Sequence, residues 1–290
     1  DTEERLQLFS LTGADHWYDI ENTDVIAYRH RKLEAVVPVR AVRSVANNYT
    51  VFSLESFIDE IAHQTGKDPL DLRLSMLNGQ GINAGGSDHD LHPLGIKPFW
   101  NVSPLQPSAS INGGKRLANV LRIATGLANY GAKLLPENTA HGIAIAGAET
   151  RTNPSFSACV AEVHVDPASA SVTINKITVA IDIGLIVNPD GAKAQVEGSI
   201  LWGLSNCMFE KLTIQNGSVV ETNFDKYKWQ SIMNIPEIEI HIVENGIYPS
   251  GAGEPATSIV SPAIMNAIFN ASGVRLRNLP LDRNELLSGL

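Results

Sequence analysis

The segment 158-ACVAEVHVDPASASVTINKITVAID-182 contains two runs rich in Val, Ile and Ala, separated by residues typical of a tight turn. β-Branched residues favour strands, and Asp166 followed by Pro167 favours a chain reversal. Residues 141–148 form a third run of the same kind. The sequence therefore predicts an antiparallel meander of three strands in this part of the chain.

Helical periodicity lies on both sides of this meander. The predicted elements are helices at 54–65, 69–77, 115–134, 192–210 and 261–273, a strand at 236–243 and a hairpin turn at Asn216-Gly217. Ser53 is expected to cap the first helix and Gly66 to end it, and Pro262 is expected to occupy the first turn of the last. Because helices and strands are mixed without strict βαβ alternation, the predicted fold class is α+β.

Composition and charge exclude several classes of function. A formal net charge of −9 without a dense Lys/Arg run argues against nucleic acid or anionic lipid as a partner. No apolar stretch approaches the roughly 18 residues of a membrane helix, so none is expected to span a bilayer. Two cysteines, Cys159 and Cys207, are too few for a disulfide framework, a zinc ribbon or a four-thiolate iron–sulfur cluster. Electrons that leave this protein would need another subunit.

The ends and the middle of the chain indicate an incomplete unit. The sequence opens at Asp1 with neither an initiator Met nor a signal peptide, so we expect a processed product, a shortened form or one piece of something longer. Residues 78–114 are rich in Gly, Pro, Ser and Asn and exceed an ordinary connection. Loops of that length are usually functional or wrap another surface.

The sharpest local motif is 250-SGAGEP-255, in which Glu254 follows a pair of glycines and precedes Pro255. Glycines permit left-handed backbone and close approach of another group, and the proline stiffens the loop. A carboxylate placed in this way can reach into a ligand pocket and act as a base. The alternative interpretation is a tight turn that needs glycine and carries an exposed Glu.

Several motifs in a fixed order resemble one known family. The segment 251-GAGEP-255 resembles the Gly-x-Gly-Glu-Pro motif of the molybdenum hydroxylases, which include xanthine dehydrogenase and aldehyde oxidoreductase. The other matching segments are 194-AQVEG-198 with Gly203-Leu204, 225-DKY-227 with 235-IPEI-238, 55-ESFIDE-60 with 66-GKDP-69 and Arg73, and 261-SPAI-264 through 276-LRNLPL-281. The resemblance spans about Pro38 to Leu281 and fits the isoquinoline 1-oxidoreductase beta-subunit branch best.

The resemblance implies roles for individual residues. Glu254 is expected to be the catalytic base that removes a proton from the oxygen nucleophile. Arg43, selected over Arg40 by its interval before the Glu of the next helix, is expected to orient the substrate and offset developing negative charge. The expected contacts of the pterin cofactor are Gln195, Gly251, Ala252 and Gly253. Relatives have a glycine-rich turn after the arginine, whereas this chain reads 43-RSVAN-47, so the substrate pocket is expected to differ.

The resemblance also implies an assembly. Two segments that the family uses to hold the pterin, Gly-Gly-Phe-Gly and Met-Gly-Gln-Gly, do not occur here. The chain therefore resembles the C-terminal part of a molybdopterin-binding large subunit, with residues 1–135 ending a first lobe and residues 136–290 forming a second. It would oxidise an aldehyde or an N-heterocycle. The implied cofactors are molybdenum-molybdopterin in its cytosine dinucleotide form and 2Fe-2S clusters on a small subunit. The remaining large subunit and a cytochrome c acceptor would be partners, and the location would be periplasmic, with the cytoplasm as the alternative.

Two other functions remain open at this point. A non-catalytic structural half would keep the fold and brace its partner, although it would have no need of Glu254 and Arg43. A hydrolase could use Asp182 with Glu197 as paired carboxylates, or a metal held by residues 88-DHDLH-92. That hydrolase would be active without molybdenum.

Overall fold

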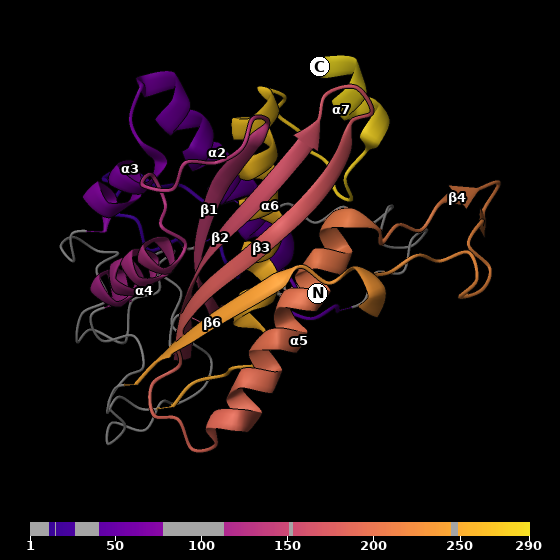
Figure 1. The fold of residues 1–290 in the computed structure, drawn as a ribbon. Helices are drawn as coiled ribbons and strands as arrows, with labels where there is room; N and C mark the ends of the chain where they lie inside the picture. Colours follow the sequence, from indigo (N-terminus) through magenta and orange to yellow (C-terminus); the bar gives the residue numbers. More distant parts are fainter. Residues whose placement is uncertain (1–11, 15, 27–40, 78–112, 151–152, 245–248) are drawn as a thin grey trace.

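The computed structural model describes residues 12–14, 16–26, 41–77, 113–150, 153–244 and 249–290 (Figure 1). The helices are α2 (Asn47–Thr65), α3 (Pro69–Met76), α4 (Gly113–Leu127), α5 (Pro189–Met208), α6 (Pro255–Ser272), α7 (Arg283–Gly289) and the short η2 (Ile232–Asn234). The strands are β1 (Thr139–Thr150), β2 (Asn153–Asp166), β3 (Ser171–Asp182), β4 (Ile214–Gln215), β5 (Ser218–Val219) and β6 (Glu237–Val243). The predicted metal group at residues 88–92 lies outside the described residues, as does most of the predicted long loop.

A four-stranded sheet forms the centre of the molecule, in the order β1-β2-β3-β6. β1, β2 and β3 are antiparallel neighbours, so the predicted meander is confirmed. The turn at 166–169 is held by the carboxylate of Asp166, which accepts a hydrogen bond of 2.9 Å from the backbone of Ala168. β6 joins the edge of the sheet parallel to β3, which a local reading of its sequence could not have shown. The α+β class is confirmed.

Helices cover both faces of the sheet, and the side chains of β2 alternate between them. Cys159, Ala161 and Val163 face a core that includes apolar residues of α5 and α6. Ala158 and Val160 face a second core that includes residues of α3 and α4. α2 contributes to both cores. The yellow α6 can be followed behind the strands in Figure 1, beside α5, with α4 on the other side.

Small residues allow the closest contacts between these layers. A Cβ atom added to Gly142 of β1 would lie 2.1 Å from the backbone nitrogen of Ala267 in α6. A Cβ atom added to Gly203 of α5 would lie 2.5 Å from the carbonyl oxygen of Thr257 in α6. Real Cβ atoms do not approach backbone atoms so closely. α6 can therefore pack this close to β1 and α5 only because glycine occupies these two positions. The position of the α6 N-terminus is thereby set.

Buried ion pairs join the helices to the sheet. The Arg73 guanidinium in α3 donates 2.9 Å to the Glu55 carboxylate in α2, which also accepts 3.1 Å from the backbone nitrogen of Ile145 in β1. Asp59 of α2 pairs at 2.6 Å with Arg275, beyond the end of α6. Buried charges are tolerated when each one is paired and hydrogen-bonded. These pairs fix α2 against β1 and α6.

Three predicted helix boundaries are wrong. α2 begins at Asn47, so Ser53 lies inside it, and α4 ends at Leu127 rather than at 134. α6 begins at Pro255 and contains Pro262. Both prolines could open a helix, and the tight packing of residues 255–261 against the strands and α5 selects the earlier one. This correction moves Glu254 from a loop to the end of a helix.

Residues from both predicted lobes share this core, because α2 and α4 pack on strands that follow residue 135. The division at 135 stays a prediction. Within the described ranges, no helix combines the length and the apolar character that crossing a membrane requires.

Candidate functional site

Four of the residues predicted for the site lie together, although they come from three distant segments. Arg43 precedes α2, Gln195 lies in α5, and Gly253 and Glu254 precede α6. The Arg43 Nε donates a short hydrogen bond to the carbonyl oxygen of Gly253. Its Nη2 donates to the carbonyl oxygen of Gln195 at 3.0 Å and to the side-chain oxygen of Gln195 at 3.2 Å. The guanidinium therefore bridges α5 and the loop before α6.

Glu254 is the N-cap residue of α6 and is half-buried. One carboxylate oxygen accepts a 3.0 Å hydrogen bond from the backbone nitrogen of Ser44. Among the described residues, the second oxygen has no hydrogen-bond donor. The positive end of the helix dipole favours a negative charge at this position. The carboxylate is consequently oriented through one of its two oxygens.

The backbone of Glu254 is fixed as firmly as its side chain. Its carbonyl oxygen accepts hydrogen bonds from the hydroxyl of Ser44 and, at 3.1 Å, from the hydroxyl of Ser199 in α5. Ser199 also lies 2.7 Å from the hydroxyl of Thr257. These contacts connect the segment before α2, α5 and α6 at a single residue.

Burial lowers the pKa of the Arg43 guanidinium, and the nearby negative charge of Glu254 partly offsets this effect. An arginine side chain still carries its positive charge near neutral pH, since its ordinary pKa is above 12. The site thus holds one positive and one negative group that are not directly ion-paired. The guanidinium can therefore stabilise negative charge that develops on a substrate, and the carboxylate can accept a proton.

Ser44 and Val45 adopt the left-handed backbone conformation, with φ of 71° and 44°. This region favours glycine, and a β-branched residue such as Val45 adopts it at a cost of roughly 1–2 kcal/mol. The conformation points the backbone nitrogen of Ser44 at the carboxylate of Glu254. Sequence reasoning missed Ser44 as a site residue. The available signal was the departure of residues 43-RSVAN-47 from the glycine-rich turn that the family resemblance implies at this place.

Glycines keep side chains away from the site. A Cβ atom added to Gly253 would lie 3.2 Å from the side-chain oxygen of Gln195, and one added to Gly198 would lie 3.2 Å from Nη1 of Arg43. Gly251 and Gly253 do not adopt the left-handed backbone that glycine permits. These glycines provide space for close approach instead. They leave the polar atoms of Gln195 and Arg43 uncovered.

The first half of the 250-SGAGEP-255 loop is tied to the sheet. The hydroxyl of Ser155 in β2 donates 2.5 Å to the carbonyl oxygen of Gly251 and lies within hydrogen-bond distance, 2.9 Å, of the hydroxyl of Ser250. The backbone nitrogen of Ser250 donates 2.8 Å to Ile183. Ala252 packs against the core. The loop is thereby held in one conformation before any ligand binds.

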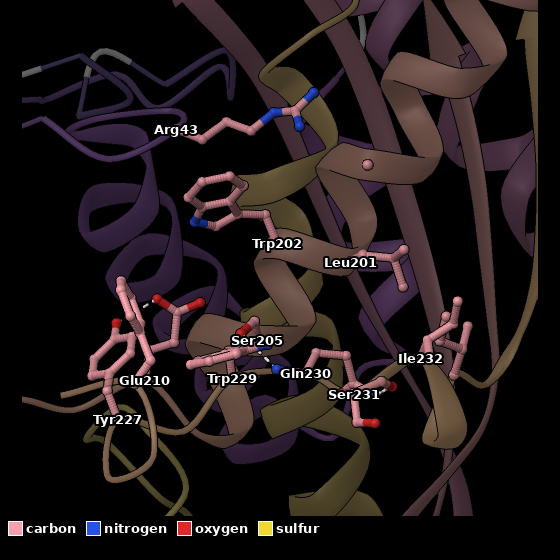
Figure 2. Close-up of a pocket in the computed structure, with 13 residues that line it drawn as sticks. Arg43, Leu201, Trp202, Ser205, Glu210, Tyr227, Trp229, Gln230, Ser231 and Ile232 are labelled. Carbon is pink, nitrogen blue, oxygen red and sulfur yellow. Dashed lines mark hydrogen bonds between the residues drawn. The ribbon is translucent and has the colours of Figure 1, made fainter.

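A groove of about 890 Å³ opens beside Arg43 and Gly198 (Figure 2). We call it the aromatic groove; the other lining residues are Leu201, Trp202, Ser205, Glu210, Phe224, Tyr227, Trp229, Gln230, Ser231, Ile232 and Ile235. It runs along the exposed side of α5, from the candidate site toward the segment that follows this helix. Sequence reasoning did not find this groove, because its two walls are formed by separate segments.

The geometry does not favour the paired-carboxylate interpretation. Asp182 is buried, and the guanidinium of Arg116 donates to its two oxygens at 2.7 and 2.5 Å. Glu197 lies on α5 with its charge 3.9 Å from Lys193. Asp182 is therefore a structural partner that holds α4 against β3. Across the part of the chain that the structure describes, no three His, Cys, Asp or Glu side chains are grouped as metal ligands.

Comparison with known sequences gives consistent matches. A family model described as a molybdopterin cofactor-binding domain matches residues 126–236. The membrane-bound aldehyde dehydrogenase [pyrroloquinoline-quinone] of Gluconacetobacter polyoxogenes is 40% identical over 97% of this chain and 34% of its own length. The isoquinoline 1-oxidoreductase subunit beta of Brevundimonas diminuta is 27% identical over 87% of this chain and 28% of its own length. The chain therefore spans about a third of the length of these relatives.

Solved structures share the fold. The aldehyde oxidoreductase from Desulfovibrio desulfuricans matches with a TM-score of 0.62 and 16% identity, over 86% of this chain and 41% of its own. The aldehyde oxidoreductase from Desulfovibrio gigas matches with a TM-score of 0.60, also at 16% identity, over 86% of this chain and 41% of its own. At this level of identity the likeness concerns the arrangement of helices and strands.

Proposed function

We propose a function for this chain from the family to which it belongs, the molybdenum hydroxylases of the xanthine dehydrogenase and aldehyde oxidoreductase type. The chain would be the C-terminal part of a large subunit that oxidises an aldehyde or an N-heteroaromatic carbon with water-derived oxygen. The observation that supports this proposal is the meeting of Arg43, Gln195, Gly253 and Glu254 at the start of α6.

The residues present fit a molybdopterin cofactor. Among the described residues, the side-chain nitrogen of Gln195 has no hydrogen-bond partner, and this residue is exposed. Gly198 and Gly253 leave room beside it for a flat polar ring system. Amide groups both donate and accept hydrogen bonds, as the edge of a pterin requires. When bound, the cofactor would supply the two-electron oxidation, and the transferred oxygen would come from water.

Glu254 would act as the general base. Its second carboxylate oxygen would accept the proton of the oxygen nucleophile, while the backbone nitrogen of Ser44 keeps the first oxygen in place. A carboxylate held by one hydrogen bond loses little freedom when it reacts, which favours a productive geometry. The dipole of α6 would stabilise the carboxylate before it takes up the proton.

Arg43 would position the substrate. Its Nε and Nη2 already hold Gly253 and Gln195, so the remaining nitrogen, Nη1, would be the one that meets the substrate. The positive charge would offset negative charge that develops on the substrate in the transition state. Arg43 would therefore have two roles, one in holding the loop and one in orienting the substrate.

Further parts of the proposal rest on family resemblance alone. These are the cytosine dinucleotide form of the cofactor, the 2Fe-2S clusters of a small subunit, a cytochrome c acceptor and a periplasmic location. The name of the Gluconacetobacter relative gives pyrroloquinoline quinone as a cofactor, whereas the matching family model is described by molybdopterin. Gln195 and the glycines beside it favour the pterin.

The test uses the native assembly that contains this chain. Molybdenum content and dye-linked oxidation of aldehydes and quinoline-type rings would be measured for the wild type, Glu254→Gln and Glu197→Gln. Glu197 is a partly exposed control on α5. We expect molybdenum in all three proteins and turnover reduced at least about 100-fold only in Glu254→Gln. Unchanged turnover in that variant would remove the base assignment. Absence of molybdenum from an active wild type would favour the quinone cofactor or a hydrolase.

A further inference from the structure

Exposed apolar side chains are concentrated in one short part of the chain. Of the 22 exposed large hydrophobic residues in the described ranges, 11 lie between Trp202 and Ile235. Phe224, Ile232 and Met233 are 75%, 82% and 83% exposed. Monomeric proteins rarely expose contiguous apolar areas of this kind, and such areas usually mark interaction surfaces. This part of the chain is therefore expected to pack against an apolar surface of another molecule or segment.

The shape of the region agrees with this interpretation. We call residues 210–235 the arm; it carries β4, β5 and η2 and extends away from the sheet beyond the end of α5 (Figure 1). Its two strands pair over only two residues each. A two-stranded hairpin of this size is marginally stable by itself in water. An arm of this kind gains stability when it packs against another surface.

The base of the arm is nevertheless well anchored. The hydroxyl of Tyr227 donates 2.6 Å to the carboxylate of Glu210, and the backbone nitrogen of Gln230 donates 3.0 Å to the hydroxyl of Ser205 in α5. Phe224 and Tyr227 both pack near the ring of Trp229. These contacts hold the arm in place and keep the aromatic groove open between the arm and α5 (Figure 2).

The groove leads to the candidate site. Arg43 and Gly198 form one end of it, and the arm forms the other. A surface that fills the groove must also come close to Arg43 and to the neighbouring Glu254. The occupant is therefore expected to be the same polypeptide that completes the site.

We propose that the arm and the aromatic groove form the docking surface for the remaining part of the large subunit. The chain accounts for 34% and 28% of the lengths of two relatives, so most of each relative lies outside the matched region. That remainder would present an apolar surface that covers Ile232, Met233 and Phe224. This inference rests on the proposed function in one respect, which is that further polypeptide completes the site around Arg43.

The experiment places a photo-cross-linking amino acid at Ile232 in the native assembly. Leu134 is the control position, because it is 98% exposed and lies outside the arm. Both side chains are so exposed that the substitutions leave the fold unchanged, which a thermal unfolding curve would verify. Cross-linked peptides would be identified by mass spectrometry. The assembly would be produced in cells that make molybdopterin and in cells that do not.

We expect cross-links from position 232 to large-subunit peptides outside these 290 residues, at least ten times more abundant than from position 134. Any other result overturns the proposal, whether cross-links to a second copy of this chain, to lipid, or at the level of the control. Since cross-linking needs no cofactor, it reports on docking alone. Cross-links without molybdenum or turnover would leave the docking surface standing and remove the proposed function.

Discussion

The contact between α5 and α6 gives a prediction that joins packing to activity. Gly203 lies in α5 where a Cβ atom would be 2.5 Å from the carbonyl oxygen of Thr257 and 3.0 Å from the side chain of Val260. Normal carbon–oxygen contacts are about 0.8 Å longer, so Gly203→Ala must push the helices apart. The obstacle is backbone, which cannot rotate away. Because the clash is with backbone, we expect the upper part of the usual cost of overpacking, about 2–3 kcal/mol, which exceeds the gain of about 1 kcal/mol from replacing a helical glycine.

The matched control is Gly126→Ala in α4, where the added atom would have no neighbour within 4 Å. We expect Gly126→Ala to raise the free energy of unfolding by roughly 0.5–1 kcal/mol and Gly203→Ala to lower it by roughly 1–2 kcal/mol. Urea denaturation of the assembled protein would measure both changes. In the same assembly, Gly203→Ala is expected to reduce turnover by about ten- to a hundredfold, because Gln195 and Glu254 move apart. Equal stabilisation by the two substitutions would refute the reasoning.

Three further predictions concern single interactions. Val45→Asn should raise the free energy of unfolding by up to about 1 kcal/mol, since asparagine tolerates the left-handed conformation better; an unchanged denaturation midpoint would contradict this. Arg116→Met should lower it by about 3–5 kcal/mol, because the charge of buried Asp182 loses its guanidinium partner, and adding Asp182→Asn should recover part of the loss. Burial lowers the pKa of His141, so the folded state resists its protonation, and stability should fall as pH drops below about 6.5. Denaturation midpoints from pH 7 to pH 5 should fall less steeply for His141→Gln, and parallel curves would exclude this histidine as the cause.

The sequence predicted helix ends, turns and strands correctly where these depend on interactions between neighbouring residues. The left-handed Gly66 after α2 and the hairpin at Asn216-Gly217 both involve residues that interact with their own neighbours. The strands β1 to β3 were predictable for the same reason. Where two prolines could each open a helix, as at Pro255 and Pro262, packing with distant elements decided the outcome.

The candidate site could be predicted as a set of residues but not as a geometry. Arg43, Gln195 and Glu254 were found by motif, whereas their contacts depend on how α5 and α6 cross. Ser44 was missed because its contribution is a backbone nitrogen in an unusual conformation, which residue type does not reveal. The aromatic groove was missed because its lining residues are separated in the sequence and share no periodicity.

The central position of α6 also governs the order in which the molecule can form. This helix packs against β1, β2, α2 and α5 and carries Glu254 at its start, yet nearly all of these partners are synthesised before it. During translation, the apolar surface that α6 will cover stays exposed on the earlier elements until residues 255–272 leave the ribosome. Chains that lack residues 255–272 therefore expose apolar surface that chaperones can bind, and the candidate site can form only after α6 has been synthesised.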